Sequence, residues 1–311
     1  RWSSGSRGKG RAHLGVLQLD RHRPPVVQRG AVDHSSMANG DVLTDQDRMI
    51  GIAMQHCSIL NVAAAADADR AVAAAREAFD SGVWSGLGFA KRQAILHRMA
   101  DLLMENIDEL ARADTRDMGK PIGQARHDVE RSAWNVRFFA DHARMSAADT
   151  YPMDSGHHAY SEFGPAGVVV AISPWNFPVN LTFGPLAGIL AAGNRAMIKP
   201  SEFTPETSKV IEEIVAEAFD PTEVTTFSGG PEVGQAFSAL PFDHMIFTGA
   251  TNIARHILTA AARNLVPVTL ELGGKSPVVI SRSADLEQAM QRVMLGKTLN
   301  AGQICLAPDY L

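Results

Sequence analysis

Two residues near the end of the sequence have side chains suited to covalent chemistry on a carbonyl group. Glu271 precedes a Leu-Gly-Gly-Lys run, and Cys305 follows the run Asn300-Ala-Gly-Gln-Ile. A thiol attacks carbon as its thiolate, and a carboxylate whose pKa is raised by partial burial can take a proton from water. The pair predicts a nucleophile and a water-activating base, although a single cysteine in an apolar segment is more often a buried core residue.

A third candidate is Asn176, in the run Pro174-Trp-Asn-Phe-Pro178. The two prolines restrict the loop, and the side-chain amide of an asparagine can donate a hydrogen bond to an oxyanion. An Asx turn is the alternative interpretation of this residue. An oxyanion donor beside a nucleophile and a base would meet the requirements of acyl chemistry.

From about Ala63 to its end, the sequence resembles the NAD(P)-dependent aldehyde dehydrogenase superfamily, and from Phe163 onward it is most similar to the coniferyl-aldehyde-type members. The resemblance implies that Cys305 forms a thiohemiacetal and then a thioester with an aldehyde. It also implies that the Asn176 amide and the Cys305 backbone N–H hold the oxyanion, and that Glu271 activates water. The strings that carry it, in the family's order, are Pro174-Trp-Asn-Phe-Pro178, Ala192-Gly-Asn194, Lys199-Pro-Ser-Glu202, Phe247-Thr-Gly249, Glu271-Leu-Gly-Gly-Lys275 and Asn300-Ala-Gly-Gln-Ile-Cys305.

The resemblance also bears on the product and on the extent of the chain. Superfamily members that pass the acyl group to coenzyme A typically lack the glutamate, so Glu271 favours release of a carboxylic acid. The family's catalytic domain continues for roughly a further domain beyond Cys305, so we expect a chain truncated at its C-terminus. The alternative function is a catalytically incompetent dinucleotide-binding remnant. For the substrate, the branch resemblance favours aromatic or medium-chain aldehydes.

The composition is that of a globular protein. Of the 311 residues, 45% are hydrophobic and 20% are charged, and the formal net charge of -5 excludes an overall basic surface for nucleic acid. No apolar run is long enough to span a bilayer. The 2 cysteines are too few for a disulfide framework and indicate a reducing compartment. We therefore expect a cytoplasmic protein whose partner is a small aldehyde, with neither nucleic acid nor membrane.

The predicted fold class is α/β: a parallel, Rossmann-type nucleotide-binding sheet flanked by helices, aldehyde-dehydrogenase-like, plus the start of an incomplete α/β catalytic domain. Short β-branched strands at 166–172, 195–199, 224–228 and 244–248 alternate with helices at 181–192, 205–219 and 231–240. This alternation is typical of a parallel sheet covered on both faces. In the catalytic part, a strand is expected at 277–281 and a helix at 286–295, both with apolar faces left exposed.

Three domain segments are expected. Residues 1–61 form a poorly defined N-terminal segment, whose basic composition is typical of a disordered tail. Met37 is an internal candidate start. Residues 62–270 form the NAD-binding domain, and residues 271–311 begin the catalytic domain. Within the NAD-binding domain we expect a helical layer at 62–148, an extended hairpin at 149–163 and the sheet at 164–270.

The helical layer and the hairpin carry further expectations. Helices are predicted at 64–79, 89–113 and 129–144, and the aromatic residues of the last one, Trp134, Phe138 and Phe139, are assigned to the core. His157 and His158 are adjacent, so they would alternate across a strand, and no metal site is expected from them. In the resembling family the hairpin crosses to another subunit, which implies a homo-oligomer for the full-length protein.

The cofactor expected is NAD, with NADP as the alternative. Lys199 and Glu202 leave a predicted strand together and could hold a ribose diol, whereas the carboxylate would repel a 2′-phosphate. Ala250 and Ala254 stand where the family commonly has Ser and Gly. The residues expected to bind the cofactor are Ile172, Ser173, Pro174, Trp175, Lys199, Glu202, Gly230, Gly234, Phe247, Thr248, Gly249, Ala250, Ile253 and Leu272.

Overall fold

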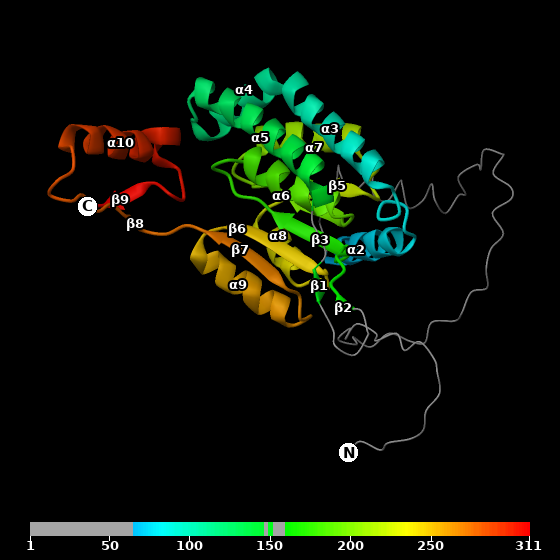
Figure 1. The fold of residues 1–311 in the computed structure, drawn as a ribbon. Helices are drawn as coiled ribbons and strands as arrows, with labels where there is room; N and C mark the ends of the chain where they lie inside the picture. The colour runs from blue at the N-terminus through cyan, green and yellow to red at the C-terminus, as the bar shows by residue number, and fades with distance from the viewer. Residues whose placement is uncertain (1–64, 146–148, 152–158) are drawn as a thin grey trace, which may run out of the picture. The chain divides into compact units, whose positions relative to one another are not determined.

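The computed structural model describes residues 65–145, 149–151 and 159–311 (Figure 1). Every element described below belongs to the unit Leu43–Leu311. The basic segment 1–61 and the pair His157-His158 lie outside the described residues. Among the residues that are described, no helix is long and apolar enough to cross a membrane.

A five-stranded sheet, in which all neighbouring strands run parallel, organises this unit. Every residue of two interior strands, β3 (Val168–Ile172) and β4 (Arg195–Lys199), is buried, as expected for a parallel sheet covered on both faces. The predicted α/β class with a parallel sheet is confirmed. In spatial order the strands are β5 (Val224–Thr226), β4 (Arg195–Lys199), β3 (Val168–Ile172), β6 (His244–Gly249) and β7 (Val268–Leu272).

The direction in which strands are added to the sheet reverses at β3. From β3 the chain moves outward through β4 to β5, and it then returns to the other side of β3 to form β6 and β7. Sheets of this kind bind ligands outside the carboxyl ends of the strands at the point of reversal. Here the carboxyl ends of β3, β4 and β6 carry Ile172, Lys199 and Gly249.

Helices cover both faces of the sheet (Figure 1). Alternate residues of β3 point to opposite faces, so Val169 and Ala171 join one hydrophobic cluster while Val168 and Val170 join the other. The first cluster packs against α3 (Phe89–Glu105), α4 (Ile107–Met118), α5 (Ile122–His142), α6 (Asn180–Ala191) and α7 (Pro205–Ala218). The second packs against α2 (Ala65–Asp80), α8 (Pro231–Ser238) and α9 (Thr251–Ala262).

Two boundaries in the helical layer differ from the prediction. The single helix expected at 89–113 is two helices, α3 and α4, because Asn106 leaves the helical conformation with φ -98° and ψ 13°. Its side-chain Nδ2 donates to the carbonyl oxygen of Leu102 at 2.9 Å, a local bond that competes with helix continuation. The helix expected from residue 129 begins at Ile122, directly after Pro121, which cannot donate a backbone hydrogen bond and suits a helix start.

The assignment of the α5 aromatic residues to the core is wrong. Trp134 is 62% exposed, and Phe138 and Phe139 are also exposed. The stripe that α5 buries contains no aromatic residue and includes Ala125, Ala133 and Ala140, whose small side chains allow close approach to the neighbouring helices. The aromatic rings pack on one another outside that stripe, with the ring centroids of Trp134 and Phe138 5.5 Å apart.

The hairpin segment and the chain's last segment contain short strands. β1 (Thr150–Tyr151) pairs antiparallel with β2 (Ala159–Tyr160). The strand expected at 277–281 is reduced to β8 (Ser276–Pro277), which pairs parallel with β9 (Pro308–Tyr310). Between them lie α10 (Leu286–Thr298) and the 3₁₀ helix η2 (Leu299–Gly302). No residue of α10 is buried, so its apolar side chains are exposed, as the sequence predicts.

Candidate active site

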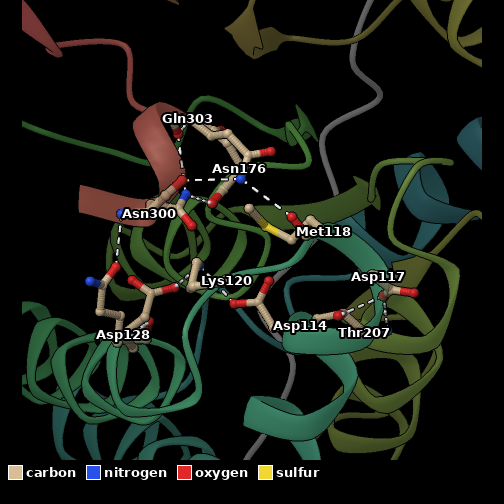
Figure 2. Close-up of polar contacts among 11 residues, drawn as sticks. Asp114, Asp117, Met118, Lys120, Asp128, Asn176, Thr207, Asn300 and Gln303 are labelled. Carbon is tan, nitrogen blue, oxygen red and sulfur yellow. Dashed lines mark hydrogen bonds and ion pairs between the residues drawn. The ribbon is translucent and has the colours of Figure 1, made fainter. Parts of the chain in front are cut away.

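The loop after β3 and the loop that precedes Cys305 are joined by hydrogen bonds of two asparagines (Figure 2). The side-chain Nδ2 of Asn176 donates to the carbonyl oxygen of Gln303 at 3.1 Å. In return, Nδ2 of Asn300 donates to the carbonyl oxygen of Asn176 at 2.9 Å. The same amide also lies 3.2 Å from the carbonyl oxygen of Gln303. The structure thus brings Asn176 to the loop that carries Cys305.

The loop before Cys305 has an unusual backbone. Asn300, Ala301 and Gly302 have φ of 50°, 55° and 84°, so three successive residues occupy the left-handed region. Glycine does this freely and asparagine tolerates it, whereas a residue such as Ala301 loses about 1–2 kcal/mol. Such a conformation persists when surrounding contacts determine it. Asn300 is 1% exposed and supplies several of those contacts.

The other two catalytic candidates are accessible. Cys305 is exposed and carries a free thiol. Glu271 lies on β7 with its Cα in register with that of Thr248 on β6, and it is exposed, so the partial burial expected for a base is not found. Within the described part of the chain, the Glu271 side chain has no hydrogen-bond or ion-pair partner.

A buried lysine lies below the Asn176 loop. Lys120, 1% exposed, follows the end of α4, and its Nζ lies 2.7 Å from Oδ2 of Asp114 and 3.3 Å from Oδ2 of Asp128. Its Nζ is also 4.4 Å from the ring centroid of Phe177, the residue after Asn176. Burial raises the pKa of Asp114 to about 6 and raises that of Asp128, while the charge of Lys120 opposes both shifts.

Lys199 and Glu202 form an ion pair at the carboxyl end of β4. Nζ of Lys199 lies 2.8 Å from Oε2 of Glu202, and the lysine is 3% exposed. Partial burial disfavours the Glu202 carboxylate, but its bonds to Lys199 and to the backbone outweigh that effect and lower its pKa. A Cβ added at Gly234 of α8 would lie 3.7 Å from Cε of Lys199. The Lys199 side chain therefore extends from β4 to α8, and Gly230 lies at the N-terminal end of that helix.

The remaining cofactor candidates lie at the ends of β3, β6 and β7. Ile172 and Ser173 are buried where β3 ends, and the following Trp175 is 37% exposed. A Cβ at Gly249 would come within 2.6 Å of Cζ of Phe247, so only glycine fits against that ring. Thr248 and Gly249 close β6, Ala250 precedes α9, Ile253 lies in its first turn, and Leu272 ends β7.

The N-terminal end of α9 suits an anionic group. Ala250 stands at the N-cap position and no side chain caps the helix, so its first backbone N–H groups remain available as donors. Ala254, where the resembling family commonly has glycine, is 2% exposed and packs in the hydrophobic cluster. Its methyl group is accommodated in the core. The free N–H groups at the start of α9 fit the pyrophosphate of a dinucleotide, and the Lys199–Glu202 pair fits its ribose.

Sequence reasoning did not identify Lys120, Asp114 or Gln124. A lysine between Gly119 and Pro121 in a turn is ordinarily exposed, and Gln124 has no sequence feature that marks it. The one available signal was a lysine spaced six and eight residues from aspartates, which is equally typical of a solvated surface. Lys120 lies over the ring of Phe177, and Gln124 accepts a hydrogen bond from the backbone N–H of Asn300. Both contacts join segments that are distant in the chain.

Comparison with known proteins identifies the family. The model of the aldehyde dehydrogenase family matches residues 54–311. A probable coniferyl aldehyde dehydrogenase of Caulobacter vibrioides is 55% identical over 230 residues, which are 71% of this chain and 47% of that protein. A coniferyl aldehyde dehydrogenase of a Pseudomonas species is 53% identical over 224 residues, again with 71% and 47% of the two chains covered. The chain spans about half the length of these curated relatives.

Solved structures agree with this assignment. An aldehyde dehydrogenase of Bacillus cereus in complex with NAD+ superposes with a TM-score of 0.74 at 36% identity, over 78% of this chain and 50% of that one. The chain belongs to the aldehyde dehydrogenase family.

Proposed function

We propose that the full-length protein oxidises an aldehyde to a carboxylic acid with NAD, through a covalent intermediate on Cys305. One observation carries the proposal: the side-chain amide of Asn176 is bonded to the backbone of the loop that presents Cys305, at 3.1 Å. An amide NH2 has two donor hydrogens. The carbonyl of Gln303 takes one of them, and the second is available to an oxyanion that forms beside the thiol.

In the first step, the Cys305 thiolate adds to the aldehyde carbon and forms a carbon–sulfur bond, and the carbonyl oxygen becomes an oxyanion. The Asn176 amide and the backbone N–H of Cys305 stabilise that charge. Bound NAD would supply the hydride acceptor, and loss of hydride from the thiohemiacetal carbon would leave a thioester on Cys305. The residues that would hold NAD are the candidates at the ends of the strands, with Lys199 and Glu202 at the adenosine ribose.

In the second step, Glu271 takes a proton from water, whose oxygen attacks the thioester carbon. The carbon–sulfur bond then breaks, and Cys305 leaves as thiolate while the acyl group leaves as the carboxylic acid. Glu271 is exposed on β7, so the base can be reached by water. We infer NAD in preference to NADP because the pKa of Glu202 is lowered, which keeps a negative charge where a 2′-phosphate would lie.

The substrate class we propose is an aromatic aldehyde conjugated like coniferyl aldehyde. The support is the similarity to two proteins that carry that name, at 55% and 53% identity. The test is NADH formation by the full-length protein with coniferyl aldehyde, compared with an aliphatic aldehyde of similar length. We expect faster turnover of the aromatic substrate and none in Cys305→Ser. Turnover by Cys305→Ser would contradict the mechanism, and equal turnover of both aldehydes would contradict the substrate class.

A second function, dinucleotide binding without oxidation, is favoured by one observation. The helix α10, which leads to the Cys305 loop, has no buried residue. The residues proposed to hold the cofactor lie instead on the sheet and its adjoining helices, so cofactor binding does not require α10. Titration of the 311-residue chain with NAD distinguishes the two functions. Binding without NADH formation from the 311-residue chain, with turnover by the full-length protein, supports the dehydrogenase; binding without turnover by either supports the second function.

A further inference from the structure

The segment 118–124, which runs from the last residue of α4 through the turn to the first residues of α5, contacts both loops of the candidate site (Figure 2). Oε1 of Gln124 accepts a hydrogen bond from the backbone N–H of Asn300 at 2.8 Å. The carbonyl oxygen of Met118 accepts one from Nε2 of Gln303 at 3.3 Å. The Nζ of Lys120 lies 4.4 Å from the ring centroid of Phe177. Three residues of this segment therefore contact the Cys305 loop or the Asn176 loop.

The Cys305 loop requires such support because of its backbone. Asn300 and Ala301 are held at φ 50° and 55°, a region that residues with a Cβ rarely adopt. Its own bonds, from Nε2 of Gln303 to the carbonyl oxygen of Asn300 and from the Asn300 amide to the Gln303 carbonyl, close the turn internally. The bonds to Gln124 and Met118 are what fix the closed turn to the helical layer.

The Asn176 loop rests on a fixed charge. Lys120 is surrounded by Asp114 and Asp128, whose carboxylates hold the flexible lysine stem in one position. A cation facing an aromatic ring is attracted to it, more strongly where both are removed from water. Because Phe177 adjoins Asn176 in the chain, a fixed ring also restricts the direction in which the Asn176 amide points.

We propose that residues 118–124 are the positioning element of the active site: Gln124 and Met118 hold the loop of Cys305, and Lys120 holds the loop of Asn176. The inference rests on the catalytic roles proposed above for Cys305 and Asn176. None of the three residues touches the reacting atoms, so each acts through its neighbours. The consequence is that the helical layer sets the distance between Cys305 and the Asn176 amide, although it precedes both residues in the chain.

Gln124 is the residue at which this is tested with least risk to folding, since it is half-buried. Gln124→Met keeps the shape of the side chain and removes the acceptor, whereas Gln124→Glu keeps an acceptor for the Asn300 N–H. Glu130→Gln, an exposed position further along α5, is the matched control. Loss of one such hydrogen bond is expected to accelerate amide hydrogen exchange of residues 299–305 about fivefold in Gln124→Met. Exchange in the other two variants should stay near wild type.

The full-length variants supply the functional measurement. In Gln124→Met, kcat for aldehyde oxidation should fall about fivefold with the KM for NAD unchanged, and Gln124→Glu should restore most of it. Unchanged exchange in Gln124→Met would overturn the proposal. So would faster exchange throughout α5 together with weaker NAD binding, because that pattern indicates general destabilisation. If the wild type forms no NADH, the proposed function fails, and the exchange experiment still decides whether Gln124 holds the loop.

Discussion

The side-chain Nδ2 of Asn176 lies 3.1 Å from the carbonyl oxygen of Gln303, although 127 residues separate them in the chain. Asn176 follows the strand at which the sheet order reverses, and Gln303 stands two residues before Cys305. The bond therefore connects the sheet with the segment that presents Cys305, the proposed nucleophile. Asn176, the proposed oxyanion donor, is thereby held against the loop that precedes Cys305.

Removing the amide should impair catalysis without affecting cofactor binding. In Asn176→Ala, the oxyanion loses a donor, and kcat is expected to fall about 100-fold or more. The dissociation constant of NAD, measured by fluorescence titration, should change little. Asn135→Ala is the control, because that amide bonds to Asn180 and not to the Cys305 loop. A kcat within about threefold of wild type would argue against the oxyanion role of Asn176.

Lys120 should be among the most sensitive positions for stability. Lys120→Met would leave the carboxylates of Asp114 and Asp128 buried without their counter-ion, which is expected to lower the free energy of unfolding by about 3–5 kcal/mol. Lys91→Met, at an exposed position of α3, should change it by less than about 0.5 kcal/mol. Urea denaturation followed by tryptophan fluorescence measures both. Equal stability of the two variants would contradict the structural role of Lys120.

Asp114 should make stability depend on pH in the direction opposite to an ordinary aspartate. Burial raises its pKa from 3.8 to about 6, so between these values the folded chain binds more protons than the unfolded chain. The contribution of Asp114 to stability is therefore present below pH 3.8 and is lost as the pH rises through 6. The difference between the two pKa values corresponds to roughly 3 kcal/mol.

The comparison with Asp114→Asn isolates this contribution, because asparagine does not titrate. The free energy of unfolding of the wild type, minus that of Asp114→Asn, should decrease between pH 4 and pH 7. Asp101→Asn, at an exposed aspartate of α3 that bonds to Arg137, serves as the control. If the wild-type minus Asp114→Asn difference stayed constant over this range, Asp114 would have an ordinary pKa.

Glu202 should determine which dinucleotide binds. Glu202→Gln removes the negative charge and retains the shape, so the affinity for NADP is expected to rise about tenfold, the size of one partly screened charge pair. NAD affinity should fall, because an amide has one oxygen with which to accept bonds from the ribose hydroxyls. Glu206→Gln, exposed on α7, is the matched control. Isothermal titration with both cofactors decides the matter, and unchanged NADP affinity in Glu202→Gln would contradict the assignment.

The sheet could be predicted because its signal is local. The run Val168-Val-Val-Ala-Ile172 is followed by a helix-forming segment, and this strand, buried on both faces, contains no polar residue to obscure the pattern. The break at Asn106 could not be predicted in this way, since Asn106 ends α3 through a bond of its own side chain within an otherwise periodic stretch. The prediction that the aromatic residues of α5 are buried is wrong because periodicity identifies an apolar stripe but not the face that neighbouring elements cover.

The candidate site likewise has features that the local sequence predicts and features that depend on tertiary packing. The types and order of Asn176, Glu271 and Cys305 are readable from motifs, whereas the burial of each side chain depends on tertiary packing. Lys120 illustrates the limit most clearly, because its burial depends on two aspartates of the neighbouring helices and on the ring of Phe177, which is distant in the chain. Nothing in the local sequence distinguishes it from a solvated lysine.

The central claim is that Cys305 carries the acyl group, and mass spectrometry of the trapped intermediate tests it most directly. In full-length Glu271→Gln, the thioester should form but hydrolyse slowly. After addition of NAD and coniferyl aldehyde, the account predicts that the peptide containing Cys305 gains the mass of the acyl group, and that it gains no such mass when NAD is omitted. An unmodified Cys305 peptide despite NADH formation, or the acyl group on another residue, would contradict the account.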